Sequence, residues 1–275
     1  MGAPDLAAFL AELDRDCLPH VSLNGVIFGA RSGRLEVLLM RWFGLDVWGL
    51  PAGYVRRDED LDAAAARMVR EQTHLEGVFL TQFHAFGGAD RGEPAFADLL
   101  RARGIEVPSG HWAFGRVVSI GYVALVDAAR ALVVPDALAD ECRWWDVAAR
   151  PRLAFDHDEM VERGLAALRA QLDELPLGAT LLPGEFTMPE LQRLYELVHG
   201  RSYDRRNFRN RMVGLGLVER LPEPRPSRVS RPTNLYRWVG RAADEALGRA
   251  LGAAETAIPR RSAMRRDGSA TGSGG

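Results

Sequence analysis

The 275-residue sequence contains no lysine, only two cysteines, and no apolar run of the roughly 20 residues that a membrane-spanning helix needs. We therefore expect no transmembrane segment. Cys17 and Cys142 lie far apart and lack the spacing of a metal site, so we expect a reducing, cytoplasmic compartment. The acidic side chains near the N-terminus are not typical of a secretory signal.

The net charge of −2 conceals a strong asymmetry along the chain. Residues 201–241 contain eleven arginines but only three acidic residues, an excess of eight positive charges. Residues 242–275 add one further positive charge, so residues 1–200 carry −11. An acidic first part and a basic second part suggest that the two parts have different partners.

Runs of apolar residues, separated by turn signals, predict several strands in the first part of the chain. We expect strands at 21–29, 35–42, 78–86, 116–126 and 142–147, and helices at 4–16 and 61–73. Ser32 and Gly33 mark the turn between the first two strands. We interpret 87–115 as a loop insertion with one short helical patch. Strands mixed with helices in this way predict an α/β domain over 18–150 with a twisted sheet and flanking helices.

The second half of the chain divides into a helix, a basic domain and a tail. An amphipathic pattern over 154–175 predicts a helix within a linking segment at 151–177. A stretch rich in proline and glycine follows, and the second domain is expected at 178–241. Residues 252–275 have the composition of a disordered tail or of an appended, non-native segment.

Residues 53–75 resemble the Nudix signature, G-x5-E-x7-R-E-U-x-E-E-x-G-U, in which U is an aliphatic residue. The matching positions are Gly53, Glu59, Arg67, Val69, Glu71 and Leu75. Met68, Gln72 and His74 replace Glu, Glu and Gly of the signature. The resemblance implies a Nudix-like α/β/α sandwich with a mixed sheet. The alternative is an ordinary amphipathic surface helix, in which Arg67 pairs with Glu71 across one turn.

The three replacements bear directly on chemistry. Positions 68, 71 and 72 share one helical face, and the resemblance implies that active members present three carboxylates there to Mg²⁺. This chain offers a thioether, one carboxylate and an amide, whereas Mg²⁺ prefers hard oxygen ligands. We therefore expect no catalytic residues and no resident metal, with at most weak Mg²⁺ binding at Glu71. His74 stands where glycine takes the left-handed helix exit, a role that Gly77 can assume.

The basic region predicts a winged helix-turn-helix. Thr187 and Glu190 form a capping-box pattern before a helix that stops at Gly200. Asp204 is a good N-cap for a second helix, which carries four arginines and two asparagines. Two expected strands, 217–221 and 234–238, enclose a basic, proline-rich loop that forms the wing.

Arginine reads guanine and pairs with phosphates, and asparagine reads adenine, so this surface suits the major groove of DNA. The predicted DNA-binding residues are Arg201, Arg205, Arg206, Asn207, Arg209, Asn210, Arg211, Arg228, Arg231, Asn234 and Tyr236. The alternative is a solvated helix face with arginines placed there by chance. RNA is a further possible partner, although the sequence lacks an aromatic stacking platform.

The combination of both regions resembles the Nudix-related transcriptional regulators, best known as repressors of NAD metabolism. The resemblance implies a homodimer on a palindromic DNA operator, released when the Nudix domain binds an ADP-ribose-type effector. Related regulators of sugar catabolism share the architecture, so a sugar is an alternative effector. We expect a repressor rather than an enzyme. The rival hypothesis is a working hydrolase of ADP-ribose or a related nucleoside diphosphate, with the winged helix as a protein-interaction module.

Four residues are candidates for effector binding. Arg41 and Arg116 are predicted to pair with phosphates, and Trp48 and Phe86 to stack on a base or pack on a sugar. The alternatives are surface ion pairs for the arginines and core packing for the aromatics. We expect Trp144 and Trp145 in the core or in a dimer interface. His157 and Asp158 fit a helix cap and domain-interface contacts better than a catalytic pair.

Overall fold

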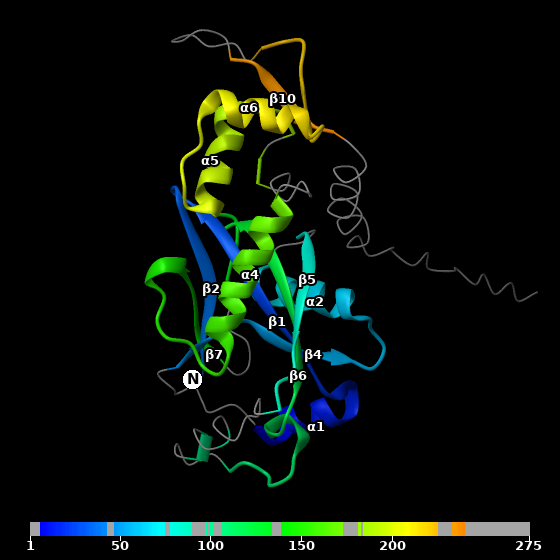
Figure 1. Cartoon of the computed structure of the whole chain (residues 1–275). Helices are drawn as coiled ribbons and strands as arrows, with labels where there is room; N and C mark the ends of the chain where they lie inside the picture. Colours follow the sequence, from blue (N-terminus) through cyan, green and yellow to red (C-terminus); the bar gives the residue numbers. More distant parts are fainter. Residues whose placement is uncertain are drawn as a thin grey trace, which may run out of the picture.

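The computed structural model describes residues 6–42, 47–74, 78–89, 97, 100–101, 106–133, 139–172, 181–182, 184–224 and 233–239. Figure 1 shows a sheet with flanking helices and, at one end of it, a smaller helical unit. Arg228, Arg231, Gly77 and the predicted tail lie outside the described residues. Among the described helices, none has the length and apolar character that crossing a bilayer requires.

The first domain is built on a seven-stranded mixed sheet. Its strands are β1 (Cys17–Arg31), β2 (Arg34–Trp42), β3 (Trp48–Gly49), β4 (Ala52–Arg56), β5 (Leu80–Phe86), β6 (Val118–Asp127) and β7 (Ala139–Asp146). The main order is β3-β2-β1-β6-β5, with β4 paired to β1 and β7 paired to β2. β1 and β6 run parallel from Val21↔Val118 to Ala30↔Asp127, and the other pairs are antiparallel. A parallel pair needs a long crossover, which the segment between these two strands supplies.

Alternating side chains of the sheet form two cores, one on each face. Leu23 and Ile27 of β1 face α2 (Leu61–Thr73), whereas Val26 and Phe28 face α4 (His157–Leu172). The result is the α/β/α sandwich that the Nudix resemblance implies. α4, which the sequence predicts as a link between domains, is therefore also one layer of the first domain, and Figure 1 shows it lying over the sheet.

A third, small core closes one end of the sheet. There α1 (Leu6–Asp16) packs Leu10 and Leu13 against Cys17 and against Ala113 of the short helix η1 (Trp112–Phe114). Burial raises the pKa of the Cys17 thiol, which favours the unreactive protonated form. A second short helix, η2 (Val147–Ala149), leads from β7 toward α4.

Within its described residues, the second domain has a three-stranded sheet and two helices. Its elements are β8 (Phe186–Thr187), α5 (Met188–His199), α6 (Arg205–Gly214), β9 (Val218–Arg220) and β10 (Leu235–Trp238). The predicted capping box at Thr187 and Glu190 is present, and Gly200 ends α5 in the left-handed conformation. The sequence predicted β9 and β10 but not β8. Since β8 has two residues and pairs with β10 far along the chain, no local pattern marks it.

α4 lies unusually close to the sheet at Gly164. A Cβ at this position would stand 3.0–3.1 Å from three carbons of the Val26 side chain. This distance is too short for a side chain without displacement of β1 or α4. Glycine is costly inside a helix, so its place here reflects the packing of helix on sheet.

We predict that Gly164→Val destabilises the protein by about 1–3 kcal/mol, because the added carbons overpack the contact with Val26. The matched control is Ala166→Val, at an exposed position of the same helix, which should cost only the helix-propensity difference of about 0.5 kcal/mol. Urea unfolding followed by tryptophan fluorescence measures both. Equal losses in the two variants would contradict the close approach.

Candidate functional site

The guanidinium group of Arg67 ties the loop before α2 to the helix. It donates to both carboxylate oxygens of Glu59, at 3.0 and 2.6 Å, and to the carbonyl of Tyr54 at 2.9 Å. Glu59 also accepts from the backbone N–H of Arg56 at 2.8 Å. The hydrogen bonds from Arg67 hold the pKa of Glu59 below its usual range. Two matching signature residues thus form a largely buried pair that shapes the loop.

The three positions that carry carboxylates in the signature point into different environments here. Met68 is buried, and its methyl carbon lies 2.9 Å from where a Cβ at Gly25 would stand. Gln72 is also buried and donates to the carbonyl of Ala52 at 3.3 Å. The side chain of Glu71 is 51% exposed and pairs with Arg67 at 3.2 Å and with Arg56 at 3.9 Å. Only one of the three positions presents an acid to solvent.

The exit of α2 has the geometry expected of the signature glycine. His74 adopts φ 55° and ψ 18°, the left-handed region, and its N–H donates to the carbonyl of Arg70 at 2.9 Å. A non-glycine residue pays a steric cost in this conformation. The backbone shape of the signature is therefore retained although its residue has changed.

Across the described ranges, no three His, Cys, Asp or Glu side chains are placed to hold one metal ion. The donor set at 68, 71 and 72 also fits Mg²⁺ poorly, since the one carboxylate is already shared by two guanidinium groups.

The four predicted effector residues lie in two separate pairs. Arg41 and Trp48 face each other across β2 and β3, where Arg41 pairs with Asp140 at 2.9 Å and Trp48 packs edge-on against Trp145. Phe86 and Arg116 lie by β5 and β6, and Arg116 donates to the carbonyl of Gly87 at 2.6 Å.

Because β3 and β5 are the two ends of the main strand order, the structure does not bring the four residues together. Trp48 and Phe86 are buried in the core, as the packing alternative expected. The effector role of the four stays a prediction.

A buried polar network, which the sequence did not indicate, holds the start of α4. The backbone N–H of Leu50 donates to Nδ1 of His157 at 3.0 Å, so the ring proton of a neutral imidazole is on Nε2. Nε2 faces the side-chain amide of Asn24 at 3.3 Å, and the amide also contacts the hydroxyl of Ser119. In the structure the Ser119 hydroxyl donates to Oδ1 of Asn24, and Nδ2 of Asn24 faces the ring; exchanging the two amide atoms would let Nε2–H donate to the amide oxygen.

Asp158 completes the fixation of this helix end. Its carboxylate accepts from the N–H of Leu153 at 3.0 Å and from Arg150 at 3.3 Å. These contacts tie the start of α4 to the segments around Leu50 and Leu153, and the helix cap that the sequence suggested for His157 and Asp158 stays a prediction.

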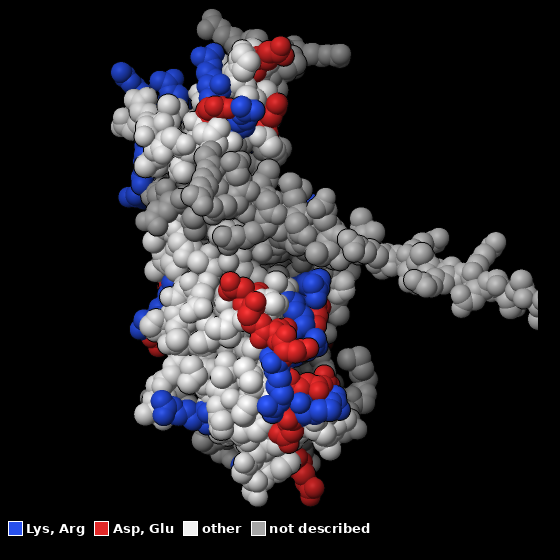
Figure 2. Space-filling view, turned by 90° about the vertical axis from the view of Figure 1, so that its right-hand side faces the viewer, with Lys and Arg blue, Asp and Glu red and all other residues white. Residues whose placement is uncertain are grey.

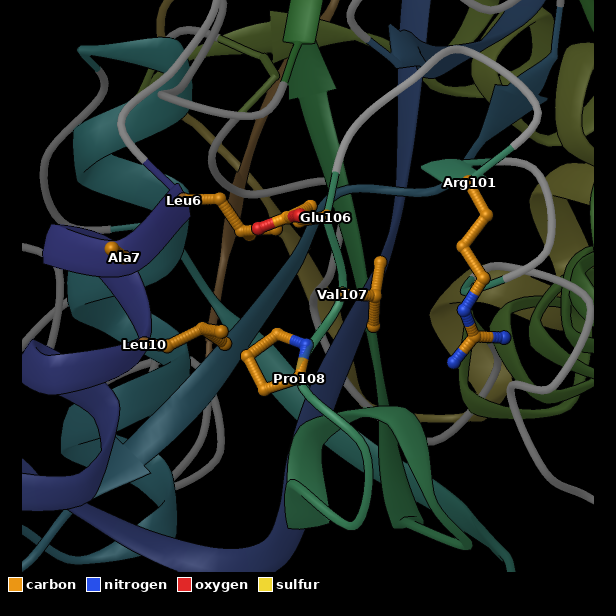
Figure 3. A pocket seen from close by; sticks show the side chains of 7 residues that line it. All are labelled: Leu6, Ala7, Leu10, Arg101, Glu106, Val107 and Pro108. Carbon is orange, nitrogen blue, oxygen red and sulfur yellow. The ribbon is translucent and has the colours of Figure 1, made fainter.

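A cleft of about 620 Å³ opens between α1 and the segment before η1 (Figure 3). Its lining residues are Leu6, Ala7, Leu10, Arg101, Glu106, Val107 and Pro108. In Figure 3 Leu10 and Pro108 point toward each other across it. None of the four predicted effector residues lines this cleft.

α6 presents a basic surface on a hydrophobic support. Phe208 and Met212 are buried, and Asp204 caps the helix by accepting from the N–H of Asn207 at 2.9 Å. All six predicted DNA-binding residues of the helix are exposed: Arg205, Arg206, Asn207, Arg209, Asn210 and Arg211. Figure 2 shows arginines standing out from the end of the molecule that holds α5 and α6.

The other predicted DNA contacts differ in placement. Arg201 is exposed and its guanidinium lies 5.0 Å from the ring centre of Tyr203. Asn234 is exposed and accepts from Arg220 at 2.8 Å. The prediction that Tyr236 contacts DNA is wrong. This side chain is only 5% exposed and packs in the core, because β10 is the central strand of its sheet.

Comparison with known proteins places these features in a family. The model of the NUDIX domain matches residues 18–164, more than half of the chain. The chain belongs to the Nudix family. The match extends past residue 150 into α4. Residues 178–238 match the NrtR DNA-binding winged helix domain.

Several known proteins are similar to this chain over most of its length. The ADPR responsive transcriptional repressor NtrR of Acinetobacter baylyi is 29% identical over 243 residues, covering 84% of this chain and 88% of the relative. The structure of Shewanella oneidensis NrtR complexed with a 27mer DNA is 26% identical with a TM-score of 0.60, covering 82% of this chain and 95% of that one. A MutT/nudix family protein from Enterococcus faecalis shares the fold, with 21% identity, a TM-score of 0.59, and coverage of 86% and 94%.

We predict that Arg67→Met destabilises the protein by roughly 3 kcal/mol at pH 7, because it leaves a largely buried carboxylate without its partner. The pKa of Glu59 is depressed in the folded state. The stabilisation is therefore complete above the unfolded glutamate pKa of about 4.3 and is lost as the pH falls through the folded value.

The difference between wild type and variant should shrink accordingly below about pH 4. Unfolding by urea at several pH values measures it. Arg56→Met, which removes an exposed and longer ion pair of the same loop, is the control and should cost under about 1 kcal/mol. A pH-independent loss in Arg67→Met would contradict the account.

Proposed function

We propose that this protein is a DNA-binding transcriptional repressor whose Nudix domain senses ADP-ribose or a closely related metabolite. The observation that carries the proposal is the exposed face of α6, where arginines and asparagines stand on a capped, well-packed helix. The relative from Acinetobacter baylyi is an ADPR responsive repressor, and the NrtR of Shewanella oneidensis forms a complex with DNA. Both support the same function for this chain.

α6 acts as the recognition helix in this proposal. On its solvent-facing side, Arg206 and Asn210 are one turn apart, a spacing that directs both toward the same groove. Arginine binds guanine with two hydrogen bonds and asparagine binds adenine similarly. In this proposal Arg205, Arg209 and Arg201 pair with phosphates. A homodimer, binding two half-sites of a palindromic operator in the cytoplasm, completes the proposal.

The Nudix domain binds its effector without hydrolysing it. Met68 fills the space beside Gly25, Gln72 is engaged with the backbone, and Glu71 is shared by two arginines. A thioether and an amide do not replace two carboxylates for Mg²⁺, so any Mg²⁺ bound at Glu71 is held weakly.

We predict that replacing Arg205, Arg206 and Arg209 together with Ala lowers DNA affinity at least 100-fold, since each removes a phosphate or base contact of about 1–3 kcal/mol. The DNA probe is a duplex selected from a random pool by the wild-type protein, and fluorescence anisotropy gives the affinity. The control replaces the exposed Arg15, Arg70 and Arg130 of the Nudix domain with Ala, which removes the same charge. If both triple variants lose the same DNA affinity, the loss is due to net charge alone. That result would contradict the assignment of DNA binding to α6.

We predict that ADP-ribose raises the thermal unfolding temperature and weakens DNA binding, while no AMP is released in the presence of Mg²⁺. Thermal shift, anisotropy and chromatography of the nucleotide measure the three effects. AMP release that depends on Mg²⁺ and disappears in Glu71→Gln would instead establish the rival hypothesis, a working hydrolase. Stabilisation by a pentose but not by ADP-ribose would place the protein with the sensors of sugars.

A further inference from the structure

Two side-chain-to-backbone hydrogen bonds join α4 of the Nudix domain to α5 of the winged helix. The hydroxyl of Tyr195, on α5, donates to the carbonyl of Leu172 at the end of α4, at 2.6 Å. In return, Nε of Arg169, on α4, donates to the carbonyl of Val198 near the end of α5, at 2.9 Å. Tyr195 is only 1% exposed, so the first hydrogen bond is shielded from water.

The last four carbonyls of a helix lack an intrahelical partner, and Arg169 donates to one of them, that of Val198 in the last turn of α5. Tyr195 ties the carbonyl of Leu172, the last described residue of α4, to α5. The two hydrogen bonds form only when α4 and α5 keep one distance and one angle to each other. An apolar contact would let the two helices slide.

The opposite end of α4 is fixed inside the Nudix domain. His157 accepts from the N–H of Leu50, in the approach to the Nudix box, and Gly164 packs directly on Val26 of β1. α4 is thus held at its start, at its middle and at its end. A displacement of residues 50–52, which lead into the Nudix box, would therefore reach the winged helix through α4.

A cleft lies on another side of α5. It has a volume of about 590 Å³ and lies between the turn after β1 and α5 with the loop that follows it. Its walls include Ser32 and Gly33 on one side and Arg193 and Gly200 on the other. α5 is therefore hydrogen-bonded to α4 and borders this cleft near the sheet turn.

We propose that Arg169 and Tyr195 are positioning residues that couple the effector domain to the DNA-reading helix. Through them the orientation of α5, and of α6 packed on it, follows the position of α4. The inference rests on the proposed function, because it assigns the route by which the effector changes DNA affinity. Coupling of this kind is a ratio of affinities, distinct from either affinity alone.

The test compares that ratio in the full-length protein and in single variants. Tyr195→Phe removes only the hydroxyl, and Arg169→Met removes only the donor group and charge. For each, the dissociation constant for the wild-type-selected DNA duplex is measured with and without saturating ADP-ribose. Calorimetry gives the affinity for ADP-ribose, and thermal unfolding confirms that each variant is folded. Arg163→Met, which removes an exposed ion pair with Glu159 on the same helix, is the control.

We expect a wild-type ratio of about fivefold or more, falling to under twofold in Tyr195→Phe and in Arg169→Met. The affinity for ADP-ribose should change less than twofold in both, and Arg163→Met should keep the wild-type ratio. Arg169→Lys keeps a hydrogen-bond donor at this position, so it should keep most of the wild-type ratio.

Two results would overturn the inference in distinguishable ways. A wild-type ratio above fivefold that survives in both variants, with only the unfolding temperature lowered, would leave Arg169 and Tyr195 a purely structural role. A wild type that binds no DNA, or whose DNA affinity ADP-ribose leaves unchanged, would remove the proposed function and the coupling role with it.

Discussion

The packing of α4 on the sheet is the constraint on which the two-domain structure depends. This helix covers one face of the Nudix core, and the winged helix is anchored to its end. Gly164 permits the close approach to Val26, and the buried imidazole of His157 fixes the start of the helix to Leu50 and Asn24. Because α4 packs on the Nudix sheet and is hydrogen-bonded to α5, the core of the Nudix domain sets the orientation of the DNA-reading surface.

The Nudix box has kept its shape while losing its acidic face. Glu59 and Arg67 still lock the loop to α2, and His74 still takes the left-handed exit, so the backbone of the motif is preserved. Met68 contributes instead to the hydrophobic core under α2. A pocket that binds a nucleotide needs the loop geometry, whereas hydrolysis also needs the carboxylates. In the proposed function, the retained residues serve binding of the effector and the replaced residues explain why it is not hydrolysed.

Local patterns predicted most elements but not the contacts between them. The capping box at Thr187, the N-cap at Asp204 and the helix over 61–73 could be predicted because each depends on residues a few positions apart. The strand β8, the network around His157 and the burial of Tyr236 depend on partners far along the chain. The predicted effector residues failed to converge for the same reason, since strand order decides which residues are neighbours.

In the proposed mechanism, α4 transmits the state of the Nudix domain to the winged helix. Hydrogen–deuterium exchange of the full-length protein, with and without ADP-ribose, is the decisive measurement. We expect amide protection to change together at residues 50–52, which lead into the Nudix box, at the end of α4 and in α5. A change confined to the Nudix core, with exchange in α5 unaltered, would contradict it.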